Sequence, residues 1–275
     1  MESTVNVNGI ELNYYDSAPG NDELQPVVFL HGLGGCWQAW LFQEPALANH
    51  GGYRIIAIDQ RGHGKTSKPH TPYSVELLAL DVVDLLEQLA LKPVYLVGHS
   101  LGGMVSYQLA ATRPDLVAKL VIINSFARIP SVKPKSIFKL FYRTSIIYGL
   151  GLMAWARALS WELLPRQDQA DLRKKLMELS VSMDDRAAYM ETMKAAVRAD
   201  LRPLLPRIQG PVLIMSADKD YTPTAAKLED AELVNSLRYG TDQELARVVE
   251  IPDSRHLSPW DQADRVNAEL LAFFS

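Results

Sequence analysis

One stretch, residues 94–104 (VYLVGHSLGGM), constrains the fold more than any other part of the chain. It begins as a short apolar run typical of a buried strand, passes through the motif G-x-S-x-G, and continues with a helical pattern. A strand that reverses directly into a helix needs a strained turning residue and leaves no room for flanking side chains. We therefore predict that Ser100 is the turning residue. The close packing of helix and strand is predicted to depend on Gly98, Gly102 and Gly103.

The chemistry of this stretch centres on Ser100. In a strand–turn–helix segment its hydroxyl stands at the helix N-terminus, where the helix dipole and unpaired N–H groups favour a developing negative charge. The alternative is a glycine-rich turn in which the serine only caps the helix, because short matches to G-x-S-x-G also arise by chance. The apolar run before the motif and the helical pattern after it favour a nucleophile.

The rest of the chain predicts an α/β fold. Asn8-Gly9, between the alternating segments 4–7 and 10–15, is a strong signal for an antiparallel hairpin at a sheet edge. Strands that alternate with helices predict a mostly parallel twisted sheet of about eight strands, with helices on both faces. The further strands are predicted at residues 26–30, 54–58, 94–97, 119–124, 212–215 and 246–251, and the clearest helical patterns at residues 74–91 and 259–274.

Between residues 125 and 206 the strand pattern stops and helical segments take over. The first half of this insert is rich in aromatic residues. We interpret residues 126–206 as a helical cap, or lid, over the strand ends, inserted between two parts of one core formed by residues 1–125 and 207–275. The predicted helices of the insert are at residues 135–148, 150–164, 168–182 and 185–200.

Composition narrows the class of partner. The chain has 275 residues, of which 22% are charged, with a formal net charge of −4 and no basic run of the kind that binds nucleic acid. The first residues show neither a basic region nor an apolar run, and no apolar segment reaches membrane-spanning length. We therefore expect a cytoplasmic protein without a membrane span.

Cys36 is the single cysteine, so no internal disulfide is expected. The oligomeric state, monomer or homodimer, is left open.

A serine hydroxyl is a weak nucleophile near neutral pH and needs a base, which in turn needs an orienting group. Of the six histidines, His256 follows the last predicted strand, at the sheet edge where the nucleophile emerges, and is the predicted base. The strand before the insert ends in Asn124, which is not a carboxylate, so the acid is sought after the next predicted strand. Asp220 is the first choice and Asp218 the second, with Asp253 as an outside candidate.

Two further loops follow strand ends. The first, residues 31–35 (HGLGG), lacks the spacing of phosphate-binding loops, so we predict an oxyanion loop in which the N–H of Leu33 faces the site. The second, residues 59–64 (DQRGHG), is predicted to be a structural turn that its Asp, Arg and His residues tie down and shape. The predicted substrate-binding residues are His31, Gly32, His99, Phe126 and Trp155.

Together these motifs resemble those of the α/β-hydrolase fold superfamily, in its serine esterase and lipase branch with a helical cap. The match spans nearly the whole chain apart from the insert, in the family's order of nucleophile, acid and base. The family's acid loop normally begins with glycine, whereas this chain has Ala217. The matching pieces are residues 31–35, residues 59–64, GHSLGG at residues 98–103, the Asp220 loop and His256.

The resemblance implies a reaction without a metal or an organic cofactor. Ser100 would attack a carbonyl carbon, His256 would take its proton, and Asp220 would hold the imidazole. The N–H groups of Leu33 and Leu101 would bind the oxyanion. Water would then release the acyl group.

The predicted function is hydrolysis of carboxylic esters or related acyl substrates through an acyl-enzyme, with a small molecule as the partner. Lactonases, C–C bond hydrolases and cofactor-free perhydrolases share the same catalytic residues and remain alternatives. A ligand-binding receptor that retains the triad is the alternative from another class. An aspartate at position 100 would indicate a haloalkane dehalogenase or an epoxide hydrolase, and Ser100 argues against both.

Overall fold

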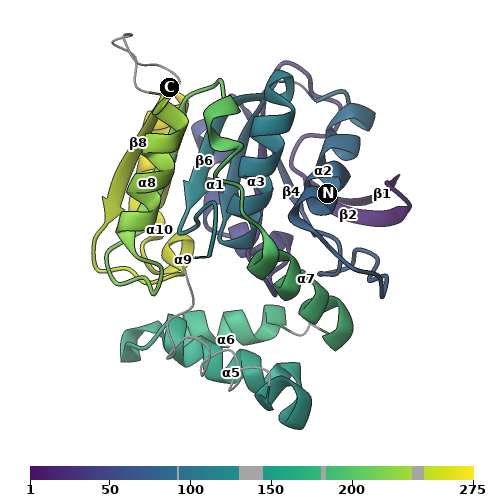
Figure 1. Ribbon diagram of the computed structural model, residues 1–275, viewed down its shortest axis with the longest axis vertical. Coiled ribbons are helices and arrows are strands. Elements are labelled where there is room, and N and C mark those ends of the chain that lie inside the picture. Colours follow the sequence, from purple (N-terminus) through teal and green to yellow (C-terminus); the bar gives the residue numbers. More distant parts are fainter. Residues whose placement is uncertain (92, 130–144, 181–183, 237–244) are drawn as a thin grey trace.

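The fold centres on one eight-stranded, mostly parallel sheet (Figure 1). The computed structural model describes residues 1–91, 93–129, 145–180, 184–236 and 245–275. The strands are β1 (Glu2–Val7), β2 (Ile10–Asp16), β3 (Gln25–Leu30), β4 (Tyr53–Ile58), β5 (Val94–His99), β6 (Val117–Ile123), β7 (Val212–Ala217) and β8 (Ala246–Ile251). They lie in the order β1-β2-β4-β3-β5-β6-β7-β8, antiparallel between β1, β2 and β4 and parallel beyond. The predicted fold class is confirmed.

The N-terminal hairpin forms where the Asn-Gly pair predicts it. Asn8 and Gly9 have φ angles of 42° and 77°, the left-handed values that this two-residue turn requires. The register pairs Val7 with Ile10 directly across the turn. Because β1 pairs only with β2, the hairpin forms an edge of the sheet, as predicted.

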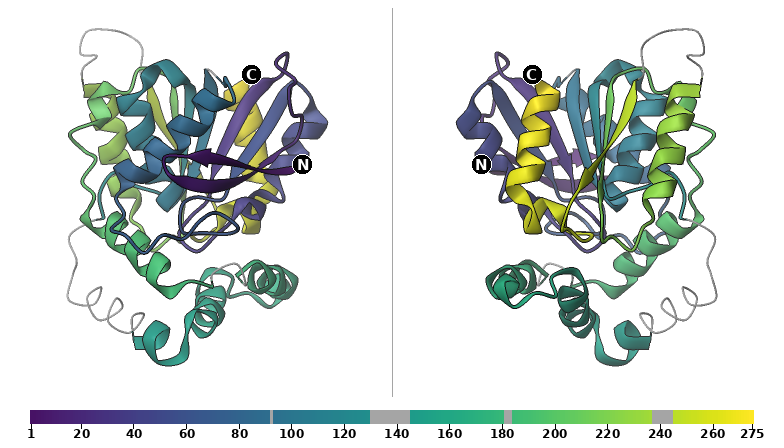
Figure 2. Two further views of the ribbon diagram at one scale, coloured as in Figure 1. Left: turned by 90° about the vertical axis from the view of Figure 1, so that its right-hand side faces the viewer. Right: turned by 90° about the vertical axis from the view of Figure 1, so that its left-hand side faces the viewer.

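Helices cover both faces of the sheet because alternate residues of each strand point to opposite sides. The helices around the sheet are α1 (Gln43–His50), α2 (Val75–Gln88), α3 (Leu101–Thr112), α8 (Thr224–Asn235), α9 (Ser258–Asp261) and α10 (Ala263–Phe274). Val28 of β3 packs in a cluster with α2, α3 and α8, whereas its neighbour Phe29 packs in a second cluster with α1 and α10. Figure 2 shows the same two layers from the side.

Some helical segments differ from the prediction. The sequence pattern does not predict α1 or α8, because neither helix shows a clear amphipathic period. The helix predicted at residues 259–274 is two helices, separated at Gln262, whose backbone angles (φ −135°, ψ 44°) are not helical. Short 3-10 segments occur at η1 (Trp37–Trp40), η2 (Pro114–Leu116), η3 (Gln167–Gln169) and η5 (Leu205–Arg207).

The insert is helical where the structure describes it. Its named helices are α5 (Leu152–Leu163), α6 (Ala170–Leu179) and α7 (Arg186–Arg198), and residues 145–150 are helical as well. Of the predicted insert helices, residues 135–144 and 181–182 lie outside the described residues. In Figures 1 and 2, α5 and α6 lie beyond the carboxyl ends of the parallel strands, and α7 leads back to the core.

None of the helices in the described part of the chain has the length and apolar character that a membrane span requires.

Candidate active site

Ser100 occupies the sharp turn between β5 and α3. Its backbone angles (φ 53°, ψ −117°) lie in a region that side-chain-bearing residues rarely adopt, at a cost of about 1–3 kcal/mol. Two hydrogen bonds hold the turn: the Ser100 N–H donates to the Ile123 carbonyl at 3.0 Å, and the Ser125 hydroxyl donates to the Ser100 carbonyl at 2.6 Å. The strained turning residue is where the sequence predicts it.

Three glycines allow the chain segments around this turn to approach one another. A Cβ atom on Gly98 would lie 2.3 Å from the Gly102 carbonyl oxygen, and one on Gly102 would lie 2.1 Å from the Leu30 carbonyl oxygen. A Cβ atom on Gly103 would lie 2.4 Å from the Cβ of Ser125. Each distance is far below van der Waals contact, so the predicted need for glycine at all three positions is confirmed.

Gly102→Ala is therefore expected to lower the free energy of unfolding by about 3 kcal/mol or more, because the added methyl group meets rigid backbone. Urea unfolding followed by circular dichroism measures the change. Gly149→Ala is the matched control: Gly149 is an exposed helical residue with open space around its Cβ position, and alanine should be neutral or stabilising there by up to about 1 kcal/mol. A Gly102→Ala protein as stable as the wild type would contradict the packing argument.

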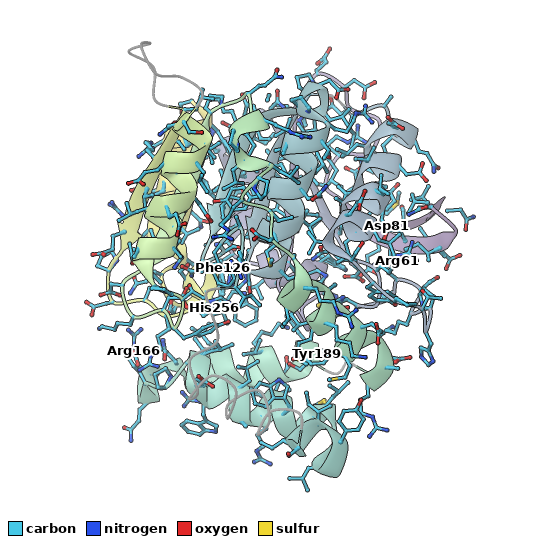
Figure 3. All side chains as sticks on the ribbon, viewed as in Figure 1. Arg61, Asp81, Phe126, Arg166, Tyr189 and His256 are labelled. Carbon is cyan, nitrogen blue, oxygen red and sulfur yellow. The ribbon has the colours of Figure 1, made fainter. Side chains whose placement is uncertain are left out.

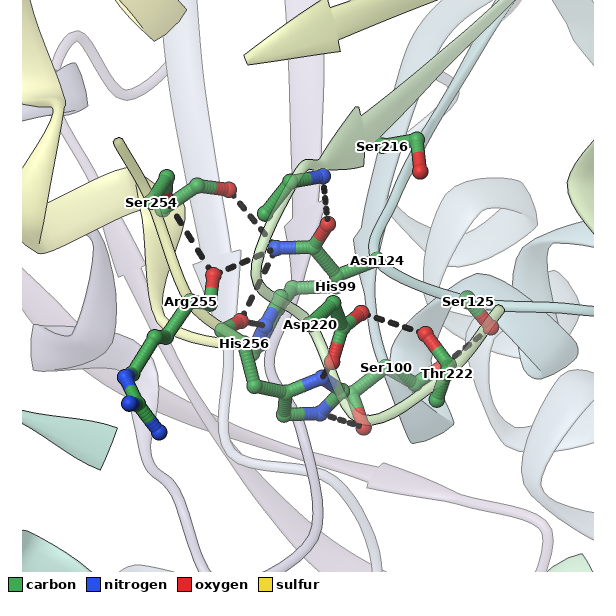
Figure 4. A network of polar contacts seen from close by, with 12 residues as sticks. His99, Ser100, Asn124, Ser125, Ser216, Asp220, Thr222, Ser254, Arg255 and His256 are labelled. Carbon is green, nitrogen blue, oxygen red and sulfur yellow. Dashed lines mark hydrogen bonds and ion pairs between the residues drawn. The ribbon is translucent and has the colours of Figure 1, made fainter. Parts of the chain in front are cut away.

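A chain of hydrogen bonds joins Ser100 to His256 and Asp220 (Figure 4). The Nε2 atom of His256 lies 2.8 Å from the Ser100 Oγ, and its Nδ1 atom lies 2.9 Å from Asp220 Oδ1. A carboxylate can only accept, so Nδ1 carries the proton and Nε2 is left to accept from the serine hydroxyl. The three side chains come from the ends of β5, β7 and β8, and are thus brought together at one edge of the sheet.

The remaining oxygen of Asp220 is also bonded. Its Oδ2 accepts hydrogen bonds from the Thr222 hydroxyl and from Lys227 Nζ, the latter at 3.1 Å. Burial acts to raise the pKa of Asp220, but the hydrogen bond and charge of His256, with the charge of Lys227, outweigh it. The pKa of Asp220 therefore lies well below its usual range, and the group is a carboxylate at neutral pH.

The structure does not bring Asp218 to the imidazole. Its Oδ1 accepts the Ser254 N–H at 2.9 Å, which ties the loop after β7 to the loop after β8. Asp253, the outside candidate, is exposed and forms an ion pair with Lys219. Of the carboxylates weighed from the sequence, Asp220 is the one that the structure places in hydrogen-bond contact with His256.

Asn124, considered in the sequence only as a missing acid, organises the loop that carries the base. Its side chain is fully buried, and its Nδ2 donates to the His256 carbonyl at 3.0 Å and to the Ser258 hydroxyl at 2.8 Å. Its Oδ1 accepts the Ala217 N–H at 2.8 Å. One amide thus connects the ends of β6 and β7 with the His256 loop. The signal in the sequence is a polar residue directly after an apolar strand.

The two predicted oxyanion donors lie beside the nucleophile. Leu101 is the first residue of α3, and a Cβ on Gly32, next to Leu33, would lie 3.1 Å from the Ser100 Cβ. Within the described part of the chain, no protein acceptor takes the N–H of Leu33 or that of Leu101. Both groups therefore remain available to an oxygen atom bound next to Ser100.

His31 and His99, which the sequence predicts among the substrate-binding residues, are buried, and each ring makes hydrogen bonds inside the protein. His31 is fully buried; its Nε2 accepts the Gln60 N–H and its Nδ1 contacts the Gly32 carbonyl. His99 Nε2 donates to the His256 carbonyl at 2.7 Å. Burial lowers the pKa of His31 to about 4 and that of His99 to about 3, so both rings are neutral near pH 7.

Aromatic side chains lie on the side of the site that faces the insert (Figure 3). Phe126 is half-buried at the start of the insert, and Tyr221, largely exposed, places its ring centroid 4.3 Å from that of His256. Trp155 is buried inside the insert, where its Nε1 donates to the Tyr189 hydroxyl at 3.0 Å. Leu33 packs against the same insert cluster.

The second loop has the structural role predicted for it. Asp59 accepts the backbone N–H of Trp37 and of Lys65, and the Arg61 guanidinium forms a buried ion pair with Asp81 at 2.7 Å. Burial lowers the pKa of His63 to about 3. In the ranges that the structure describes, no group of three or more His, Cys, Asp or Glu side chains is arranged to hold a metal ion.

Comparisons with known proteins identify the family. The protein named "Putative carbamate hydrolase RutD" from Serratia proteamaculans (strain 568) is 30% identical over 259 residues, which cover 89% of this chain and 92% of that protein. The "3-oxoadipate enol-lactonase 2" of Acinetobacter baylyi is 27% identical over 228 residues, or 82% of each chain. The crystal structure of the enol-lactonase from Burkholderia xenovorans LB400 superimposes with a TM-score of 0.86 at 27% identity, covering 99% of each chain.

The family model for the alpha/beta hydrolase fold matches residues 25–263, which include the nucleophile turn, the acid loop and the His256 loop. The match begins at β3 and ends at the start of α10, so it takes in the whole parallel part of the sheet. The chain belongs to the alpha/beta hydrolase fold family.

Proposed function

We propose that the chain is a serine hydrolase that cleaves carboxylic esters or related acyl substrates through an acyl-enzyme. The observation that carries the proposal is the hydrogen-bonded order Ser100–His256–Asp220, beside two N–H groups that bond no acceptor among the described residues. A nucleophile, a base and an orienting acid at hydrogen-bond distances are the parts that acyl transfer requires.

The geometry suggests the following course. The Ser100 Oγ attacks the carbonyl carbon while His256 Nε2 takes the hydroxyl proton, and the Asp220 carboxylate stabilises the resulting imidazolium. The negative charge moves to the carbonyl oxygen, where the N–H groups of Leu33 and Leu101 would bind it. His256 then gives its proton to the leaving alcohol. Water attacks the acyl-enzyme in the same way, and the acid product leaves.

The insert at residues 126–206 is proposed as the cap of this site, with residues 1–125 and 207–275 as the core. Three described groups near the site on this side, Leu33, Phe126 and Tyr221, are apolar or aromatic. Such a lining supports substrates with an uncharged acyl or alcohol group. Figure 3 shows Phe126 and His256 on the side of the core that faces α5 and α6.

A lactonase is the second candidate, because a lactone is a cyclic ester and needs no further catalytic group. The likeness to the Burkholderia xenovorans enol-lactonase structure, at 27% identity, favours it specifically. A carbamate is a further acyl group open to the same attack, as the name of the Serratia proteamaculans relative indicates for that protein.

A fluorophosphonate probe is expected to label one residue, Ser100, with loss of activity in step with labelling, because its hydroxyl is hydrogen-bonded to the His256 base. Peptide mapping by mass spectrometry locates the label. Turnover of p-nitrophenyl esters of graded chain length, and of simple lactones, then separates the two candidates. Labelling at another serine would contradict the site. Absence of multiple turnover, together with ligands that raise the melting temperature, would support the receptor alternative.

A further inference from the structure

A lysine that no sequence motif singles out lies behind the candidate acid. Lys227 belongs to α8, and its side chain is 0% exposed, as is that of Asp220. Its Nζ donates to Asp220 Oδ2 at 3.1 Å and to the Thr222 carbonyl at 3.2 Å. The ammonium therefore bonds the carboxylate oxygen that points away from His256.

A fully buried lysine is rare because removing an ammonium from water is unfavourable unless a partner compensates. Burial lowers the pKa of Lys227, whereas the charge and hydrogen bond of Asp220 and the charge of Asp230 act to raise it. The short contact with a carboxylate is the compensation that the ammonium form needs. Replacing the pair by apolar groups would serve stability at least as well, so stability alone does not account for the lysine.

We propose that Lys227 is a positioning residue that sets the strength of His256 as a base by balancing the charge of Asp220. The proposal rests on the proposed function. With Lys227 in place, the Asp220–Lys227 pair has no net charge before reaction, so the carboxylate attracts an imidazole proton less strongly than a lone buried carboxylate would.

The groups around the imidazole are consistent with this role. His99, whose ring centroid lies 5.1 Å from that of His256, is buried and neutral near pH 7. Tyr221 contributes its ring, and the Thr222 hydroxyl donates to the same Asp220 oxygen without adding a charge. In the described part of the chain, Lys227 is the cation in direct contact with the acid. Among the described residues, the titratable or charged groups in contact with His256 or its acid include Asp220, Tyr221, His99 and Lys227, with Asp230 beyond the lysine.

The test removes the charge in the full chain. For p-nitrophenyl acetate, kcat/KM is expected to fall on the acidic side of its pH profile, which is called the acid limb below. Lys227→Met should move this acid limb to higher pH by about one unit, because the Asp220 charge is then no longer balanced and attracts the imidazolium more strongly. Plateau activity should fall roughly tenfold, since Asp220 loses a contact that orients it. Lys227→Gln keeps a donor to Asp220 without the charge, and should show the same shift if the Met variant does not fold. Lys227→Arg keeps the charge and should leave the limb in place.

Thr222→Val is the matched control, because it removes a hydrogen bond from the same oxygen but no charge. It should lower activity and leave the acid limb where it is in the wild type. If Lys227→Met and Lys227→Gln left the acid limb of the pH profile where it is in the wild type, the proposal would be overturned and Lys227 would have a structural role. NMR titration of the His256 imidazole in isotopically labelled wild type and Lys227→Gln is independent of turnover. A shift there without any esterase activity would contradict the proposed function and retain the inference.

Discussion

Replacing Ser100 by alanine is expected to reduce ester hydrolysis by about 10⁶-fold in kcat, which is the scale of loss when a serine nucleophile is removed. The change takes away the attacking oxygen 2.8 Å from His256 Nε2 and leaves the backbone contacts of the turn in place. The fold should therefore survive. Initial rates on a p-nitrophenyl ester and the melting temperature by circular dichroism measure the two effects.

Ser106→Ala is the matched control for this loss. Ser106 lies on the same helix, and its buried hydroxyl donates to the Gly102 carbonyl at 2.7 Å, away from any base. Its removal should leave kcat within a few-fold of the wild type. Activity of Ser100→Ala above about 1% of wild type, in protein shown to be free of wild-type enzyme, would show that another group attacks the substrate.

Asp220→Asn is expected to lower kcat by about 10⁴-fold, because an amide in place of the carboxylate favours the wrong imidazole tautomer. It also leaves the ammonium of Lys227 buried without its carboxylate, so the free energy of unfolding should fall by about 3 kcal/mol. Steady-state kinetics and urea unfolding give the two quantities. The loss of stability reports mainly the cost of leaving the Lys227 ammonium buried without its carboxylate, and the loss of rate reports the changed contact with His256.

Asp218→Asn serves as the comparison, since it changes the neighbouring acid of the same loop. The asparagine oxygen can still accept the Ser254 N–H, so activity should remain within about tenfold of the wild type. A larger loss at Asp218 than at Asp220 would move the role of the acid to Asp218 and contradict the hydrogen-bond order described above.

The parts of the fold that follow from local pattern are predictable from sequence. The apolar runs at β3, β4 and β7 are strands because short buried segments of a parallel sheet must be apolar on both faces. Asn8-Gly9 sets the hairpin because few other residues tolerate its angles. By contrast, α1 and α8 depend on contacts with the core, and the spacing of their apolar residues does not predict a helix.

The candidate site residues also divide into those that the sequence predicts and those whose surroundings only the fold decides. Ser100 and the glycines around it are evident from sequence, since G-x-S-x-G between an apolar run and a helical pattern is the signature of this sharp turn. In the sequence, His31 and His99 are plausible site residues as well. In the structure, both rings are buried and make hydrogen bonds inside the protein. Burial depends on the whole fold, so a single sequence does not distinguish a buried histidine from one at an open site.

What the sequence determined by itself is the strand–turn–helix at Ser100, because an apolar run, G-x-S-x-G and a helical pattern follow one another directly along the chain. Only the tertiary structure decided between Asp218 and Asp220, which stand two residues apart in one loop and differ by which atom they face. It alone also placed Lys227 against Asp220 and Asn124 under the His256 loop. These contacts join separate strand ends, and their distances follow from how the sheet and its helices pack.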